Sequence, residues 1–455
     1  MFKNNFTIVK FKCLSIIYSD IYDAKFNRFS IMQNIKSKRN FYKSFFNFFF
    51  LIFIYCNPTF ALENKSQSIE NNIKINDNWR TVLNKASGET IFFHAWGGAK
   101  NINSYIKWAS KEVMQRYNIK VNHVKISDTS NVVARILSEK TAGKHENGAV
   151  DLIWINGENF SFMQKHKLLF KDNWIMNLPE TNNMDFTSNP SLLNDFGVPT
   201  NGMEMPWGVS QLNFYYDSKY LKYPPKSAIE LKKYIINNKG RFTFPQPPDF
   251  VGTSFLKQVL IELIEDKSIL KSTYVKDRHE DLLTPLWAWL NDVTPFLWRK
   301  GINYPTNYMS LTQLVADREI DIGMAFNIAH ASNAISEGRL PKTIRGYIHK
   351  KGTLANVHFL SIPYNSSKKA ASQVFINFLI SPEAQIRKQN KDIWGDPSVL
   401  SMNKMLPEWK NKFKNLSKGI ATLSNEELQL KLEEPHPSWV KVIESKWIEK
   451  FGSSK

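Results

Sequence analysis

Short apolar runs that end at glycine or asparagine alternate with helical periodicity in the first half of this chain. Residues 152–155, Leu-Ile-Trp-Ile, are too short for a helix and stop at Asn156-Gly157, so they predict a buried strand followed by a tight turn. The same alternation of strand and helix patterns precedes this run, at residues 90–96, 102–113, 121–126 and 132–137. This order predicts an α/β fold with a parallel sheet, in which ligands bind beyond the carboxyl ends of the strands.

The second half of the chain continues the α/β pattern with longer interruptions. Residues 205–217 predict one long strand after an extended Pro-Trp-Gly entry. A proline-rich loop at 245–250 leads into an apolar helix, which we expect to start near Thr253 and Ser254. Further predicted strands and helices occupy residues 241–244, 281–290, 308–316, 320–326, 356–363 and 368–380.

The first 61 residues have a different pattern. Basic residues at 36–43 precede an apolar run at 45–55, and the segment ends at Ala61. A positive region, a short apolar core and a small-residue end predict a secretory signal peptide cleaved after Ala61, and therefore a mature chain in the periplasm. An uncleaved membrane anchor is the structural alternative, and Met32 is an alternative start of the chain.

Composition narrows the possible chemistry. Removal of the first 61 of 455 residues leaves 394, which is enough for two lobes with cores of their own. Both cysteines, Cys13 and Cys56, lie in the removed part, so we expect no disulfide or thiol chemistry in the mature chain. The formal net charge is +19, of which +12 remains after cleavage. The lysines are scattered and no arginine-rich helix occurs, so we expect no nucleic-acid partner.

Several motifs resemble those of the periplasmic solute-binding proteins of ABC transporters. Besides the signal peptide they are Phe93-His94-Ala95-Trp96-Gly97-Gly98, Trp154-Ile155-Asn156-Gly157-Glu158-Asn159-Phe160, Pro206-Trp207-Gly208, Pro247-Pro248-Asp249-Phe250-Val251-Gly252-Thr253 and Ser381-Pro382-Glu383-Ala384-Gln385. The resemblance covers nearly the whole mature chain, and it is strongest to a branch distantly akin to thiamine-, ferric-ion- and polyamine-binding members.

This resemblance implies a two-lobed type II periplasmic-binding fold, in which each lobe is a mostly parallel sheet flanked by helices and the ligand cleft lies between the lobes. The first lobe would comprise 62–204 and 347–388, and the second 205–346 and 389–455 with the C-terminal helices. Hinge closure would capture a small polar solute for delivery to an ABC transporter permease in the inner membrane. The chain would be a monomer without cofactor or metal. Tyr215-Tyr216 lies along a predicted strand, unlike the tyrosine pair of ferric-ion binders, so iron is not expected.

A binding cleft of this kind needs aromatic faces and a few fixed polar groups from both lobes. The candidate ligand-binding residues are Trp96, Gly97, Gly98, Asn156, Glu158 and Asn159 on one side, and Trp207, Thr253, Ser254 and Asn327 on the other. The tryptophans could stack on a planar or cationic ligand, with Glu158 pairing a positive charge. Hydroxyls and free N–H groups at the helix start near Thr253 and Ser254 could hold an anionic group. Core packing of the tryptophans and an ordinary N-cap are the alternatives.

The competing class is a secreted hydrolase or another periplasmic enzyme that uses the same cleft. His-Glu-x-x-His, Gly-x-Ser-x-Gly, Walker-type loops and cysteine-rich metal spacing are absent from the sequence, so we expect no enzyme. His94, His330 and His358 could meet near strand ends, but a satisfied polar role is favoured over a metal site. A scaffold or adhesin is disfavoured by the α/β pattern and the lack of repeats.

Overall fold

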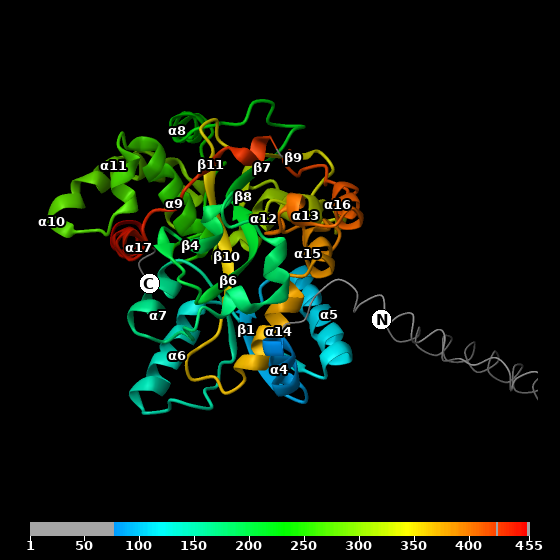
Figure 1. Ribbon diagram of the computed structural model, residues 1–455. Coiled ribbons are helices and arrows are strands. Elements are labelled where there is room, and N and C mark those ends of the chain that lie inside the picture. Colours follow the sequence, from blue (N-terminus) through cyan, green and yellow to red (C-terminus); the bar gives the residue numbers. More distant parts are fainter. Residues whose placement is uncertain (1–76, 425, 453–455) are drawn as a thin grey trace, which may run out of the picture. The chain divides into compact units, whose positions relative to one another are not determined.

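The chain divides into two units, Met1–Lys74 and Ile75–Lys455. In a computed structural model, residues 77–424 and 426–452 are described, and all of them belong to the second unit (Figure 1). The predicted signal peptide lies outside the described residues. A search of this described part found no helix with the length and hydrophobicity needed to cross a membrane.

The buried hydrophobic residues form two clusters, and the first of them is built on a mixed sheet. The strands of this sheet are β1 (Thr90–Trp96), β2 (Lys120–Ile126), β3 (Leu152–Ile155), β6 (Glu204–Gln211), β10 (Thr353–Ser361) and β11 (Lys431–Leu432). Their order is β11-β10-β3-β1-β2, with β6 paired to β10. β1 runs parallel to β2 and β3, whereas β10 runs antiparallel to β3 and β6. The carboxyl ends of β1, β2 and β3 therefore share one edge, as the sequence predicts.

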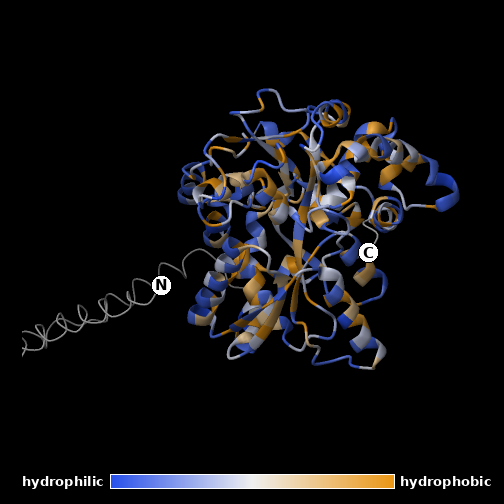
Figure 2. Cartoon of the chain, turned by 180° about the vertical axis from the view of Figure 1, so that it is seen from behind, coloured by the Kyte–Doolittle hydropathy of each residue, from blue (hydrophilic) through white to orange (hydrophobic). Residues whose placement is uncertain are grey.

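Helices cover both faces of this sheet. They are α4 (Asp77–Ala86), α5 (Lys100–Tyr117), α6 (Thr129–Thr141), α7 (Glu158–Lys165), α14 (Lys369–Leu379), α15 (Pro382–Gln389) and α16 (Pro407–Lys414). Figure 1 shows α4, α5 and α14 on one side of β1 and α6 and α7 on the other. Hydrophobic residues concentrate on the strands and inward helix faces, with hydrophilic residues outside (Figure 2). Phe93 of β1 and Phe375 of α14, for example, meet edge to face at 5.8 Å between ring centroids.

The second hydrophobic cluster surrounds a smaller sheet. Its strands are β7 (Asn213–Asp217), β8 (Ile322–Ala325) and β9 (Ile344–Tyr347), with β7 in the centre. The helices of this part are α8 (Ala228–Asn237), α9 (Phe250–Leu263), α10 (Lys276–His279), α11 (Thr284–Val293), α12 (Tyr308–Ala316), α13 (His330–Ser336) and α17 (Ser438–Phe451). Both strand pairs are antiparallel. The mostly parallel sheet expected here is therefore wrong, because a run that is buried on both faces has the same pattern in either direction.

Short elements complete the described residues. A two-stranded ribbon is formed by β4 (Asn194–Asp195) and β5 (Val198–Pro199). Short 3-10 helices occupy Trp174–Asn177, Pro179–Asn183, Pro190–Leu193, Lys267–Lys271, Asp281–Leu283, Thr294–Phe296, Trp298–Gly301, Met402–Lys404 and Glu427–Gln429. The predicted strand at 241–244 is not a strand. The carbonyl of Arg241 accepts a hydrogen bond from the amide of Asp321, and the carbonyl of Phe242 accepts one from the amide of Trp298.

The chain passes between the two clusters three times, and the first two passages are neighbours; the third lies between Phe413 and Ala421. Trp207 packs in the first cluster and Leu212 in the second, and on the return Leu354 packs in the second and Val357 in the first. The predicted long strand 205–217 is thus two strands, β6 and β7, which pair in different sheets. The amide of Leu212, the residue between them, donates to the carbonyl of Leu354 at 2.8 Å, which joins the first two passages.

The C-terminal region contributes to both clusters. Trp394, Val399 and Phe413 pack in the first cluster, whereas Trp439 and Trp447 of α17 pack in the second. We expected residues 389–455 to belong to the second lobe as a whole. Trp394 holds its part of this region beside the first sheet, because its ring packs against Trp154 of β3 at 5.6 Å and Trp207 of β6 at 5.3 Å between ring centroids.

Candidate functional site

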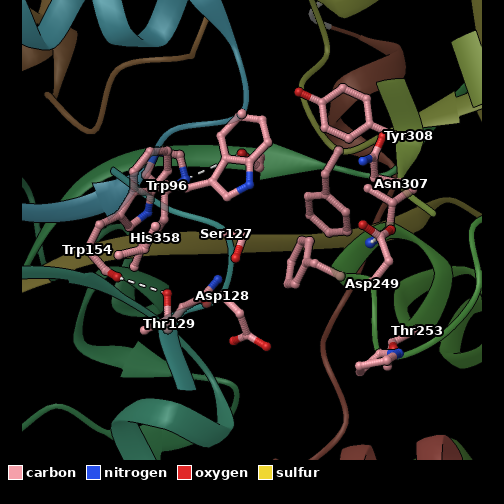
Figure 3. Close-up of a pocket in the computed structure, with 18 of the residues that line it drawn as sticks. Trp96, Ser127, Asp128, Thr129, Trp154, Asp249, Thr253, Asn307, Tyr308 and His358 are labelled. Carbon is pink, nitrogen blue, oxygen red and sulfur yellow. Dashed lines mark hydrogen bonds between the residues drawn. The ribbon is translucent and has the colours of Figure 1, made fainter. Parts of the chain in front are cut away.

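A cavity of about 780 Å³ is lined by residues that pack with each of the two clusters. The first sheet contributes the residues that follow β1, β2 and β3, and the other wall comes from the starts of α9 and α12 and from α17. Figure 3 shows Trp96, Ser127, Asp128 and Thr129 on one side of the space, facing Asp249, Thr253, Asn307 and Tyr308 on the other.

Most of the candidate residues from the sequence meet at this cavity. The structure places Trp96, Gly97, Gly98, Asn156, Glu158, Asn159, Thr253 and Asn327 in its lining. Trp207 and Ser254 are not among the lining residues, and both are fully buried. The Trp207 ring packs edge to face against Trp154 at 5.0 Å and against Trp394 at 5.3 Å. Trp207 is therefore a core residue beneath the cavity, because its side chain points to the inner face of β6.

The turn after β1 holds an indole against the cavity. A Cβ added to Gly98 would lie 2.2 Å from the ring of Trp96, so only glycine lets the indole lie flat over this turn. The Trp96 ring lies 6.0 Å from the ring of Tyr308, with the two planes inclined at 30°. Trp96 ends β1 and Tyr308 begins α12, so this aromatic pair joins the two walls (Figure 3).

The turn after β3 brings a carboxylate to the cavity. Gly157 has φ +62°, which favours glycine, and its amide donates to the buried Asp195 carboxylate at 2.7 Å. This turn begins α7 at Glu158, whose side chain is exposed to the cavity. Desolvation by the surrounding walls raises the pKa of Glu158, and the charges of Glu434 and Asp128 add to this effect.

The helix behind Thr253 starts earlier than predicted. α9 begins at Phe250, and the carboxylate of Asp249 accepts from the amides of Val251 at 3.0 Å and Gly252 at 3.1 Å. The predicted free N–H groups are therefore already occupied. The Thr253 hydroxyl donates instead to Glu444 of α17 at 2.7 Å. The start near Thr253 and Ser254 is wrong because Asp249 before the apolar run is itself a strong N-cap signal.

Two carboxyl groups that line the cavity, Glu444 and Asp249, have raised pKa values. Burial raises the pKa of Glu444 to about 7, and the charges of Glu158 and Asp128 add to the shift. Burial likewise raises the pKa of Asp249 to about 6, against the opposing hydrogen bonds from Gly252 and Val251. At neutral pH the cavity therefore holds carboxyl groups that exchange protons readily.

Sequence reasoning missed several lining residues. Asp128 and Asn307 cap α6 and α12, and each accepts backbone hydrogen bonds from the first turn of its helix. Such N-caps carry a local signal that could have placed them at the cavity, because their helices follow predicted strand ends or turns. Tyr308 and Glu444 carry no such signal, since only the tertiary fold brings their helices to this wall.

A buried polar group lies at the base of the cavity. His358 Nε2 is 3.0 Å from Asp396 Oδ2, and the ammonium of Lys388 also donates to this oxygen. Although burial alone would raise it, the charges of His358 and Lys388 hold the pKa of Asp396 below its usual value. The Ser210 hydroxyl lies 3.3 Å from the other ring nitrogen of His358. Within residues 77–424 and 426–452, no group of three or more His, Cys, Asp or Glu side chains is placed to hold a metal ion.

Comparisons with known proteins agree with this architecture. The family model described as bacterial extracellular solute-binding protein matches residues 108–414. The chain is 37% identical over 375 residues to protein YnjB of Escherichia coli K12, which covers 82% of this chain and 94% of YnjB.

Solved structures of low sequence identity share the fold. The periplasmic binding protein AfuA of Actinobacillus pleuropneumoniae, with fructose-6-phosphate bound, superposes with a TM-score of 0.56 at 14% identity, covering 81% of this chain and 100% of AfuA. The spermidine/putrescine substrate-binding protein PotD of Streptococcus pneumoniae gives 0.56 at 15% identity, covering 79% and 98%. The fold is that of the two-lobed periplasmic binding proteins. With the family match over most of its length, the chain belongs to the bacterial extracellular solute-binding proteins, the substrate-binding proteins of ABC transporters.

Proposed function

We propose that the mature chain, cleaved after Ala61, works in the periplasm by capturing a small polar solute in the cavity and delivering it to an ABC permease of the inner membrane. The observation that carries this proposal is the cavity itself, because its walls come from both hydrophobic clusters and one aromatic pair, Trp96 and Tyr308, spans them. Concave sites with aromatic faces and a few fixed polar groups are typical of small-molecule binding.

We propose further that the two clusters are the two lobes. Their boundaries differ from those given by the sequence, because Trp207 and residues 394–413 pack with the first cluster and Tyr347 and Leu354 pack with the second. Hinge motion would then occur at the three passages, residues 207–212, 354–357 and 413–421. The hydrogen bond between Leu212 and Leu354 keeps the first two passages together, so a small rotation at the three passages would open or close the cavity without disturbing either core.

A secreted hydrolase is the second candidate, because Ser210, His358 and Asp396 form a relay at the cavity. In a hydrolytic triad the histidine takes the serine proton and the carboxylate serves the histidine alone. Here the ammonium of Lys388 shares the carboxylate of Asp396, and His358 packs beside the rings of Trp154 and Trp394. This environment favours a structural polar group, and we propose that the protein binds without turnover.

Intrinsic tryptophan fluorescence of residues 62–455 tests the proposal. The titrants are thiamine derivatives, polyamines, amino acids and phosphonates. Saturable quenching by one compound is expected, and it should be lost in Trp96→Ala and kept in Trp409→Ala, since Trp409 is half-buried outside the cavity. A flat response throughout, or product formation that is lost in Ser210→Ala, would contradict solute capture.

A further inference from the structure

The charged groups of the cavity are not equally available to a ligand. Asp128 and Asp249 are engaged by the amides of their own helices, and Asn307 fills the start of α12 in the same way. The starts of these three helices, which would otherwise attract an anionic group, are therefore already satisfied by side chains of this protein. The starts of α5 and α7 have no side-chain cap, and the first turn of α7 carries Glu158 itself. The cavity offers an anion less than its helix arrangement alone would indicate.

Two of the basic side chains that line the cavity are also engaged. Lys257 Nζ lies 2.6 Å from Glu434 Oε2, and both side chains are 2% exposed, so its charge is neutralised within the wall. His358 is bound to Asp396. Lys125, on β2, is the lining lysine that remains exposed.

Besides Asp128 and Asp249, which are held by backbone amides, two carboxyl groups of the cavity have no cation bound to them among the described residues. Glu158, on α7, receives a hydrogen bond from the side-chain amide of Asn159. Glu444, on α17, receives one from the hydroxyl of Thr253. The first comes from the sheet side and the second from the opposite wall, so the two carboxyl groups line one space from different parts of the fold.

We propose that the cavity takes an organic cation whose positive group lies between Glu158 and Glu444, and that its binding displaces a proton from these carboxyl groups. This inference rests on the proposed solute capture and adds the ligand class and the exchanged proton. The aromatic faces of Trp96 and Tyr308 would receive the hydrocarbon or aromatic body of the cation. A cation held in this way would join the two walls, whereas two ionised carboxylates alone repel each other.

The protonation of Glu444 supports the exchange. Its pKa is raised to about 7 by burial and by the charges of Glu158 and Asp128, while Thr253 and Lys257 act in the opposite direction. About half of Glu444 is therefore protonated at neutral pH. A bound cation favours the ionised form, so binding releases a proton below about pH 7. The affinity should fall by up to about tenfold for each pH unit below 7 and level off above it.

Two of the charged groups that act on Glu444, Lys257 and Asp128, also act on the pKa of Glu158. Burial raises its pKa, Lys257 of α9 opposes the shift, and Glu434 and Asp128 add to it. The buried Asp195 lies behind the turn and is sensitive to the charge of Glu158. Removal of the Glu158 charge should therefore weaken cation binding and also lower the pKa of Glu444.

A thermal-shift panel at pH 7.5 provides the first test. The probes are putrescine, spermidine, thiamine and choline as cations, glycine as a zwitterion, and inorganic phosphate, sulfate and methylphosphonate as anions. Stabilisation by one or more of the four cations supports the inference, and stabilisation by glycine alone overturns it. Stabilisation by the anions alone overturns it and leaves solute capture standing. No stabilisation by any probe counts against solute capture itself and overturns the inference with it.

Calorimetric titration with the stabilising cation then tests the two carboxyl groups. In wild-type protein, two buffers with different ionisation enthalpies should reveal proton release near pH 6.5 without any substitution. Glu158→Gln and Glu444→Gln should each raise Kd by about tenfold or more at pH 7.5, and Glu444→Gln should lose most of the dependence of Kd on pH between 6 and 8. Glu449→Gln, on the exposed face of α17, is the matched control and should behave as wild type. A pH-independent Kd in wild type, or an unchanged Kd in both variants, would overturn the inference.

Discussion

Replacement of Lys257 by methionine tests how the wall of the cavity is held together. The Lys257 ammonium and the Glu434 carboxylate are 2.6 Å apart and almost completely buried. The other oxygen of Glu434 accepts from the side-chain amide of Asn356 at 3.0 Å. Methionine keeps much of the hydrocarbon volume of lysine but removes the charge. Glu434 is then left as a buried carboxylate without its cation.

The expected loss of stability follows from this geometry. Removal of one partner of a buried ion pair costs about 3–5 kcal/mol in the free energy of unfolding. The entropy of unfolding is about 2.1 cal/mol/K per residue, or about 0.8 kcal/mol/K for the roughly 380 residues of the folded unit. Lys257→Met should therefore lower Tm by about 4–6 °C.

Scanning calorimetry at pH 7.5 without added solute measures this difference. Lys271→Met is the matched control, because Lys271 pairs with Glu433 at 2.5 Å but the two side chains are 63% and 76% exposed. Exposed pairs contribute about 0–1 kcal/mol, so the Tm of this control should change by about 1 °C or less. Lys257→Met combined with Glu434→Gln should recover most of the loss, since the amide oxygen still accepts from Asn356. Equal values of Tm for Lys257→Met and Lys271→Met would refute the reasoning.

The remaining predictions concern the cavity. Glu444→Gln should raise Tm at pH 8 and leave it unchanged near pH 4. The pKa of Glu444 is raised to about 7 in the folded protein, so the wild-type protein loses stability as the pH rises above the pKa that this carboxyl has in the unfolded chain. Thermal melts at the two pH values check this. Gly98→Ala would place a methyl group 2.2 Å from the Trp96 ring, so it should alter the tryptophan emission, but not when Trp96→Phe is also present. Trp207→Ala should destabilise the fold by about 3–5 kcal/mol in denaturant titrations, and a smaller cost for it than for Trp96→Ala would contradict its assignment to the core.

The first half of the site could be predicted because its signals are local. β1 occupies Thr90–Trp96, the range predicted from its apolar run and the glycines that follow. Parallel pairing with β2 and β3 then places all three strand ends at one edge, so Trp96 and Glu158 meet without further information.

The second half depends on features that the pattern does not contain. The direction of β8 relative to β7 does not change the apolar pattern, so the antiparallel sheet could not be read from the sequence. Nor does the pattern say which face of a strand buried on both sides holds a given residue. The sequence therefore could not tell that Trp207 points into the core and not into the cavity. Glu444 lies 191 residues from its hydrogen-bond partner Thr253, and only the packing of α17 against α9 brings the two together.

The acidic side chains around the cavity differ in what holds them, and this difference separates folding from binding. Glu434 and Asp396 each bind a buried lysine, so their charges are compensated and their loss would weaken the walls. Within the part of the chain that the structure describes, Glu158 and Glu444 have no lysine bound to them, and their raised pKa values mean that ionisation is unfavourable in the folded protein. Replacement of Glu444 by glutamine would make the ligand-free protein more stable, because it removes the cost of ionising this carboxyl. In the wild-type protein a bound cation would offset the same cost. A substitution that raises Tm and weakens cation binding together would therefore identify Glu444 as a group that serves the ligand and not the fold.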